Sequence, residues 1–311
     1  MTAVEIADFG EPLHVEIGTS LGEAPLYRPE DDTLHYIPQR CVHFKILGGL
    51  DRSYRDQIHV LSNLANFDSQ ARILKPSDSI SVVVFQKSKD GIYLGAGSRG
   101  LLTINEKPGE THVLKGQVII HIRKSGHHNT QLLPESAFGK VRFNDGAVDC
   151  KGRLWVGEFD LTCLGTPLSD PYIPKGRLWR YDPDGTATTH DDEIYCSNGI
   201  AWSPDSKYMY YNDSYGCIVR RYDFDQDTGN LSNRIDFIDF RKPGDVVRRG
   251  TPEVAKTVPE YLRGGQPDGM VTDSEGNLWI AIWGKGCVLC FSAEGTVLRE
   301  IRELRIGPLT L

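Results

Sequence analysis

Short apolar runs bounded by glycine, aspartate, asparagine or proline recur along the whole chain. Examples are residues 81–85 (SVVVF), 154–158 (LWVGE) and 278–283 (LWIAIW). Runs of this length between turn residues are typical of strands. Long amphipathic helical patterns are nearly absent, and residues 55–67 are the best candidate for a turn or two of helix. The pattern therefore predicts an all-β protein.

One unit repeats within this pattern: a turn, an aliphatic residue followed by an aromatic or apolar pair, and then a second turn and strand. The copies begin at Thr33, Gly91, Arg153, Lys207 and Asn277. Leu34 and Leu278 are four repeats apart, which gives a period of about 61 residues. A period of this length, filled with four strands, is typical of a propeller blade. We therefore expect one β-propeller domain over residues 1–311, with five recognisable units.

A second strand precedes each unit by about ten residues, and in a propeller the first strand of every blade lines the central channel. Equivalent positions near the starts of these strands are Glu23, Ser81, Asp145, Asn198 and Asp268. An alternative is that Asp-Gly and Asn-Gly are turn dipeptides, but this does not explain Glu23. Crowded carboxylates repel each other, and a bound cation would relieve the repulsion. Carboxylate and amide oxygens suit calcium, magnesium or manganese better than zinc.

Four ordered motifs carry a family resemblance: residues 21–25 (LGEAP), 142–146 (RFNDG), 197–203 (SNGIAWS) and 266–270 (QPDGM). They resemble the gluconolactonase/regucalcin/senescence-marker-protein family. The resemblance implies a six-bladed β-propeller that hydrolyses a sugar lactone with one divalent cation, calcium first, with magnesium, manganese or zinc as alternatives.

By this resemblance the metal ligands are Glu23, Asn198 and Asp268, and the substrate-binding residues are Arg142 and Asn144. The repeat argument agrees with the family at Glu23, Asn198 and Asp268. In the third blade it selects Asp145, which we expect to be a second-shell or water-mediated partner.

Some features depart from the family pattern. The chain reaches Leu311 soon after the fifth unit, so we expect the last blade to be incomplete. Residues 13–18 are expected to supply its closing strand, and an open blade edge would allow pairing with a second copy of the chain. Glu158 adds a carboxylate near the expected site, and residues 43–77 and 241–266 are candidates for a lid or a partner surface.

Lactone hydrolysis requires polarisation of a carbonyl, an activated water and a protonated leaving alkoxide. Asp268 is the best candidate for the catalytic base, with Arg142 and Asn144 orienting the hydroxyls of the substrate. The chain contains no G-x-S-x-G, which argues against a nucleophile-elbow esterase. The alternatives are a non-catalytic calcium-binding or scaffold propeller and a lactonase that acts on a non-sugar metabolite.

The charge and hydropathy of the chain limit the kinds of partner that it is expected to bind. The chain of 311 residues has 35 Lys and Arg against 42 Asp and Glu, a net charge of -7, which argues against nucleic acid. No apolar stretch approaches membrane-spanning length, and the acidic N-terminus does not read as a signal peptide. An odd count of 7 cysteines then suggests reduced thiols in the cytoplasm. Cys287 and Cys290 are expected to pack in the core, and His127-His128 to lie in a solvated loop.

Overall fold

The computed structural model describes residues 5–7, 21–30, 32–39, 58–62, 70–74, 79–85, 92–98, 100–105, 132–245 and 256–302. The chain divides into two compact units. The N-terminal unit comprises Glu11–Phe143 with Thr310–Leu311, and the C-terminal unit comprises Met1–Gly10 with Asn144–Leu309.

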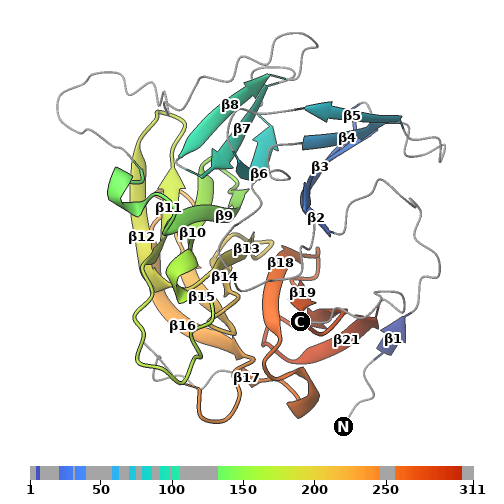
Figure 1. The fold of residues 1–311 in the computed structure, drawn as a ribbon. Helices are drawn as coiled ribbons and strands as arrows, with labels where there is room; N and C mark the ends of the chain where they lie inside the picture. The colour runs from blue at the N-terminus through green and yellow to red at the C-terminus, as the bar shows by residue number, and fades with distance from the viewer. Residues whose placement is uncertain are drawn as a thin grey trace. The chain divides into compact units, whose positions relative to one another are not determined.

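The N-terminal unit holds two antiparallel sheets (Figure 1). The first contains β2 (Leu21–Arg28), β3 (Thr33–Gln39), β4 (Ile58–Ser62) and β5 (Gln70–Leu74), in that order. The second contains β6 (Ile80–Phe85), β7 (Ile92–Gly97) and β8 (Leu101–Asn105). Ile37, Ile58 and Val60 from the first sheet share a buried cluster with Ile80 and Tyr93 from the second.

The C-terminal unit holds three sheets, of which the first contains β9 (Val141–Val148), β10 (Leu154–Asp160), β11 (Gly176–Tyr181) and β12 (Ala187–Ile194). The second contains β13 (Ser197–Trp202), β14 (Tyr208–Asp213), β15 (Ile218–Phe224), β16 (Leu231–Asp239) and β17 (Lys256–Thr257). The third contains β18 (Gln266–Thr272), β19 (Leu278–Trp283), β20 (Cys287–Phe291), β21 (Val297–Arg302) and β1 (Glu5–Ala7). Short 3-10 helices are η3 (Glu135–Ala137), η4 (Leu161–Cys163) and η5 (Glu260–Leu262).

Consecutive up-and-down sheets of this kind are the blades of a β-propeller, so the all-β propeller prediction is confirmed at this level. The five expected inner strands are β2, β6, β9, β13 and β18, and each forms one edge of its sheet. The expected number of blades is not found, because the described residues form four complete blades and one three-stranded sheet rather than six blades.

A helix within residues 55–67 and a closing strand at residues 13–18 were expected from the sequence. The helix expected within residues 55–67 is wrong, because Ile58–Ser62 is strand β4, paired with β3 and β5. Ile58 and Val60 are both buried, which is the period of two that a strand gives. Residues 13–18, expected as the closing strand, lie outside the described residues. An N-terminal segment does pair with the last sheet, but it is β1, which lies parallel to β21.

The same turn chemistry connects the first two strands of two blades. Asp149 accepts hydrogen bonds from the backbone of Arg153 (3.1 Å) and from the indole of Trp155 (2.9 Å). Asp273 makes the equivalent bonds to Asn277 (2.9 Å) and Trp279 (3.0 Å). The glycines of these turns, at positions 152 and 276, have φ of 80° and 85°, a region that other residues rarely adopt. The repeated Asp and Leu-Trp pattern thus encodes the same hairpin in these two blades.

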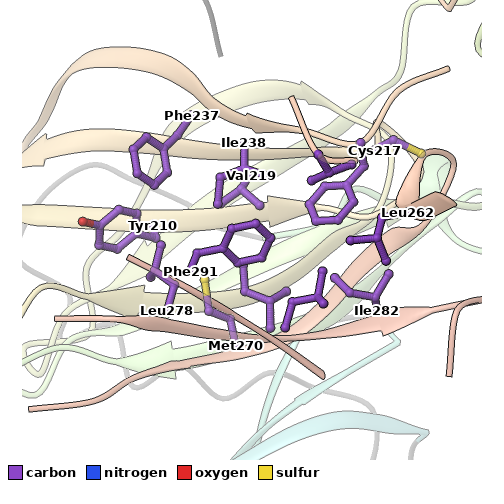
Figure 2. Packing of buried hydrophobic residues seen from close by; sticks show 14 of the residues in the cluster. Tyr210, Cys217, Val219, Phe237, Ile238, Leu262, Met270, Leu278, Ile282 and Phe291 are labelled. Atoms are coloured by element: carbon purple, nitrogen blue, oxygen red, sulfur yellow. The ribbon is translucent and has the colours of Figure 1, made fainter. Parts of the chain in front are cut away.

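Apolar side chains fill the space between neighbouring blades of the C-terminal unit. Tyr210, Val219 and Ile238 from the β13–β17 sheet lie against Leu278 and Phe291 from the β18–β21 sheet (Figure 2). A second cluster, which includes Trp155 and Met209, lies between the β9–β12 and β13–β17 sheets. The cysteines of the C-x-x-C sequence are free and buried within β20, as expected. These packed faces fix β9, β13 and β18, the strands that carry the candidate site.

Candidate functional site

Three inner strands of the C-terminal unit bring polar residues together. Strand β13 lies beside both β10 and β18. Asn198 is the second residue of β13, Asp268 is the third residue of β18, and Asp145 lies in the middle of β9. The side-chain amide of Asn198 favours the charged form of the Asp268 carboxylate, and the charge of Asp268 acts on Asp145. The C-terminal unit therefore contains a cluster of two carboxylates and one amide, which we call the acidic site.

A β-bulge at each strand start helps to aim these side chains. In β13, Asn198 and Gly199 lie between the paired positions Ser197 and Ile200, where the register with β14 shifts. In β18 the same shift occurs at Asp268 and Gly269. Bulges of this kind redirect a side chain and occur often beside active sites. The Asn-Gly and Asp-Gly dipeptides are therefore parts of strands here, and the alternative that they are turns is wrong.

The two carboxylates of the acidic site have perturbed acidities. Burial raises the pKa of Asp145 to about 7, the backbone N–H of Gly146 opposes the shift, and the charge of Asp268 adds to it. Burial also raises the pKa of Asp268, against hydrogen bonds from Asn198 and from the backbone N–H of Gly269. Both shifts mean that the surrounding protein groups do not fully stabilise the negative charges of these two carboxylates. Such perturbed carboxylates are frequent in functional sites.

Hydrogen bonds fix the orientation of two amide side chains. The Nδ2 atom of Asn144 donates to the backbone oxygen of Ser197 at 2.7 Å. The Nδ2 atom of Asn198 donates to the hydroxyl oxygen of Ser214 at 3.0 Å and also serves the Asp268 carboxylate. In both residues the NH2 group is thus engaged with protein, and Oδ1 is the end that remains for a ligand.

A pair of side chains from the β14 end ties the two site strands together. Asn212 donates to the backbone oxygen of Asp268 at 2.6 Å, and Ser214 donates to the backbone oxygen of Pro267 at 2.6 Å. Both side chains are buried. The sequence analysis assigned no role to Asn212 or Ser214. Their contacts join different blades, so spacing along the chain could not reveal them.

Two predicted site residues lie in the other unit. Glu23 belongs to β2, and its side chain is outside the described residues. Arg142 donates from its guanidinium to the backbone oxygen of Phe143 at 2.8 Å. The structure therefore brings together Asn198 and Asp268 from the predicted set, with Asp145 and Asn144 on neighbouring β9. The roles of Glu23 and Arg142 stay predictions.

Glu158, the extra carboxylate expected near the site, is engaged by protein donors. Its side chain is fully buried and accepts hydrogen bonds from the Arg177 guanidinium (2.9 Å) and the Trp179 indole (2.6 Å). The backbone N–H of Arg177 adds a further bond at 3.0 Å. Burial raises the pKa of Glu158, while these partners oppose the shift. The residue holds β10 to β11 and has no lone pair to spare for catalysis.

The donor chemistry of the acidic site fits a hard divalent cation. Within the described ranges, no three His, Cys, Asp or Glu side chains gather as a metal cluster. The acidic site nevertheless offers two carboxylates with raised pKa and the Oδ1 of Asn198, all oxygen donors. Oxygen ligands suit calcium, magnesium or manganese. The residues that would hold such a cation from this unit are Asn198 and Asp268, with Asp145 beside them.

Other predicted features give little further information. His127 and His128 lie outside the described residues, as do most of residues 43–77 and residues 246–255 of the second candidate lid. None of the helices in the described part of the chain has the length and apolar character needed to cross a bilayer.

The sequence matches a known protein family over most of its length. A family model for the SMP-30/Gluconolactonase/LRE-like region matches residues 21–303, which includes every predicted site residue. The chain belongs to the SMP-30/gluconolactonase/LRE-like family. The resemblance inferred from the four motifs is thus confirmed.

Two curated relatives match part of the chain. Regucalcin of Danio rerio is 34% identical over 149 residues, which cover 48% of this chain and 42% of regucalcin. Pentonolactonase XacC of Haloferax volcanii is 33% identical over 158 residues, which cover 51% of this chain and 44% of that enzyme. Each match thus spans less than half of the relative's length.

A solved structure extends the comparison to the fold. The structure of a calcium-binding protein, regucalcin, from Agrobacterium tumefaciens matches 91% of this chain and 75% of its own, with a TM-score of 0.63. Its sequence identity of 22% limits this likeness to the fold.

Proposed function

We propose that the protein is a lactonase that hydrolyses a sugar lactone to the corresponding aldonic acid with the help of one divalent cation. The observation that carries the proposal is the acidic site, where Asn198 and Asp268 lie near the starts of strands that Ser214 and Asn212 tie together, with Asp145 of β9 beside them. Membership of the SMP-30/gluconolactonase/LRE-like family and similarity to a pentonolactonase support the reaction type, and the oxygen donors of the acidic site support the cation.

The residues of the chain would act as follows. Asp268 would accept a proton from the attacking water at its carboxylate, because a base must lie within hydrogen-bond reach of the reacting group. Asn144 would accept a hydrogen bond from a substrate hydroxyl at Oδ1, since its NH2 group is committed to Ser197. Arg142 would donate to another substrate oxygen, and Glu23 would complete the cation ligands. A bound divalent cation supplies Lewis-acid polarisation of the ester carbonyl.

The test is a pH-drop assay against a panel of aldonolactones of five and six carbons. The protein is stripped with a chelator, and calcium, magnesium, manganese and zinc are added back one at a time. Acid release that stops with chelator and returns with one cation supports the proposal. Equal rates with and without cation, or rates no faster than buffer, would overturn it.

A second candidate is a cation-binding propeller without catalysis, favoured by the regucalcin likeness. The same assay separates the two, because this candidate binds calcium without releasing acid from any lactone. Acid release from a non-sugar lactone alone would support the third alternative and would correct the substrate class.

We propose six blades in the complete ring, a homo-oligomer formed through an open blade edge, and a cytoplasmic location. The free state of the six described cysteines is compatible with a reducing compartment.

A further inference from the structure

Ser214 occupies a fixed place between the two site strands. Its backbone N–H donates to the oxygen of Cys196 at 2.9 Å, and its own backbone oxygen accepts from Cys217 at 3.1 Å. Its side chain is 4% exposed. The hydroxyl therefore has little freedom, and its contacts with Pro267 and Asn198 define its hydrogen bonding.

The hydroxyl has one proton, and the geometry decides where the proton goes. The backbone oxygen of Pro267, 2.6 Å away, can only accept, so Ser214 must donate its proton there. Towards Asn198, at 3.0 Å, the hydroxyl oxygen can then only accept. The side-chain atom of Asn198 that faces Ser214 must for this reason be the NH2 group, which removes the usual ambiguity between the two ends of an amide.

We propose that Ser214 is a positioning residue that selects which end of the Asn198 amide faces the ligand. With one N–H bound to Ser214 and the other available to the Asp268 carboxylate, Asn198 presents Oδ1, the end that binds a cation. An amide turned the other way would present NH2 to a cation and its oxygen to the Asp268 carboxylate, both repulsive. This inference rests on the proposed function, because it assigns Asn198 to cation binding.

The same hydroxyl also links the two strands that carry the ligands. Asn198 belongs to β13 and Pro267 precedes Asp268 in β18, so Ser214 bridges a residue of one strand to the backbone of the other. Asn212 adds a parallel bridge to the backbone oxygen of Asp268. Removing the Ser214 hydroxyl leaves the Asn212 bridge in place, so we expect the fold to persist while the orientation of Asn198 is lost.

A matched control lies at the other end of the same strands. The Thr272 hydroxyl, in β18, donates to the backbone oxygen of Trp202, in β13, at 2.8 Å. Thr272→Val removes one hydroxyl-to-carbonyl bond between the same two strands, distant from Asn198 along the chain. Ser214→Ala and Thr272→Val should therefore lower stability by similar amounts, about 1 kcal/mol, but only Ser214→Ala should change the acidic site.

The experiment is calorimetric titration of calcium into chelator-treated wild type, Ser214→Ala, Ser214→Thr and Thr272→Val. Loss of a residue that orients a ligand weakens metal binding by about 10–100-fold, which is the result expected for Ser214→Ala. Ser214→Thr keeps the hydroxyl and should restore affinity to within about threefold of wild type, as should Thr272→Val. Initial rates on a cleaved lactone at saturating calcium should then show turnover by Ser214→Ala close to wild type, because Asp268 is intact.

The outcomes separate this inference from the proposed function. If wild type binds calcium and releases acid but Ser214→Ala binds as tightly as Thr272→Val, the positioning role is wrong and the proposed function stands. If Ser214→Thr binds as weakly as Ser214→Ala, the hydroxyl is not the cause and the inference also fails. If wild type neither binds a divalent cation nor cleaves a lactone, the proposed function fails and this inference fails with it.

Discussion

Gly199 allows the two site strands to approach each other, and a single methyl group there should separate them. A Cβ at position 199 would lie 2.5 Å from the amide nitrogen of Met270 and 2.6 Å from the backbone oxygen of Asp268. Ordinary contact begins at 3.4 Å, and both obstacles are backbone atoms that cannot rotate away. Gly199→Ala therefore requires β13 and β18 to move apart by roughly 1 Å, a displacement that can cost about 100-fold in rate.

Gly269 is the matched control, because it also follows a site residue within a bulge. Among the described residues, a Cβ at position 269 would meet nothing within 4 Å. Overpacking costs about 1–3 kcal/mol, the loss expected for Gly199→Ala. Gly269→Ala should instead be neutral or stabilise by about 0.4–1 kcal/mol, since alanine restricts the unfolded chain.

The assays are urea denaturation for stability and initial lactone hydrolysis for activity, on both variants and wild type. We expect Gly199→Ala to lose stability and most of its turnover, and Gly269→Ala to keep both. Equal behaviour of the two alanine variants would show that close approach of β13 and β18 does not shape the acidic site, and the reasoning would be refuted.

Three further predictions concern ionisable groups. Glu158→Gln should lower stability by about 2 kcal/mol, because the Arg177 guanidinium loses its buried charged partner. The turnover of the folded fraction should not change. A large loss of turnover with normal stability in urea would make Glu158 a catalytic candidate again. Burial lowers the pKa of His190 to about 4 from 6.5, so the unfolded chain binds its proton first as pH falls. The free energy of unfolding should drop as the pH falls from about 6.5 to 4, by less than about 3 kcal/mol because His190 is partly exposed. A His190→Gln variant whose stability in urea depends on pH as that of wild type does would contradict this. Asp145→Asn should raise the melting temperature of cation-free protein at pH 8, because it removes a buried negative charge that Asp268 also repels, and calcium should narrow the difference; a lower melting temperature than wild type would show that the charge of Asp145 does not oppose folding.

Much of the strand order could be predicted from the sequence, because each blade repeats the same local chemistry. The aspartate that caps the turn and the tryptophan that bonds to it recur at fixed spacing, as in Asp149 with Trp155 and Asp273 with Trp279. The convergence of Asn198 with Asp268 also followed, since equivalent positions of a repeat occupy equivalent places.

The parts that could not be predicted depend on contacts between strands that are distant in sequence. The partners of Glu158 could not be predicted, because Arg177 lies 19 positions along the chain on the next strand. The roles of Ser214 and Gly199 arise from the backbone of β18, more than 50 residues later. Residues 55–67 were misjudged because the pairing of β4 with β3 and β5 overrides a weak local preference.

The most direct test of the account is the initial rate of lactone hydrolysis against cation concentration for wild type, Asn198→Ala and Asp268→Asn. Asn198 offers a neutral oxygen that water can partly replace, so excess cation should restore much of the activity of Asn198→Ala. Asp268→Asn removes both a charged ligand and the proposed base, and loss of a general base costs about 10²–10⁴-fold in rate. We expect saturating cation to restore little of its activity. Recovery of Asp268→Asn to near wild-type turnover would show that Asp268 is only a ligand and would contradict the central claim.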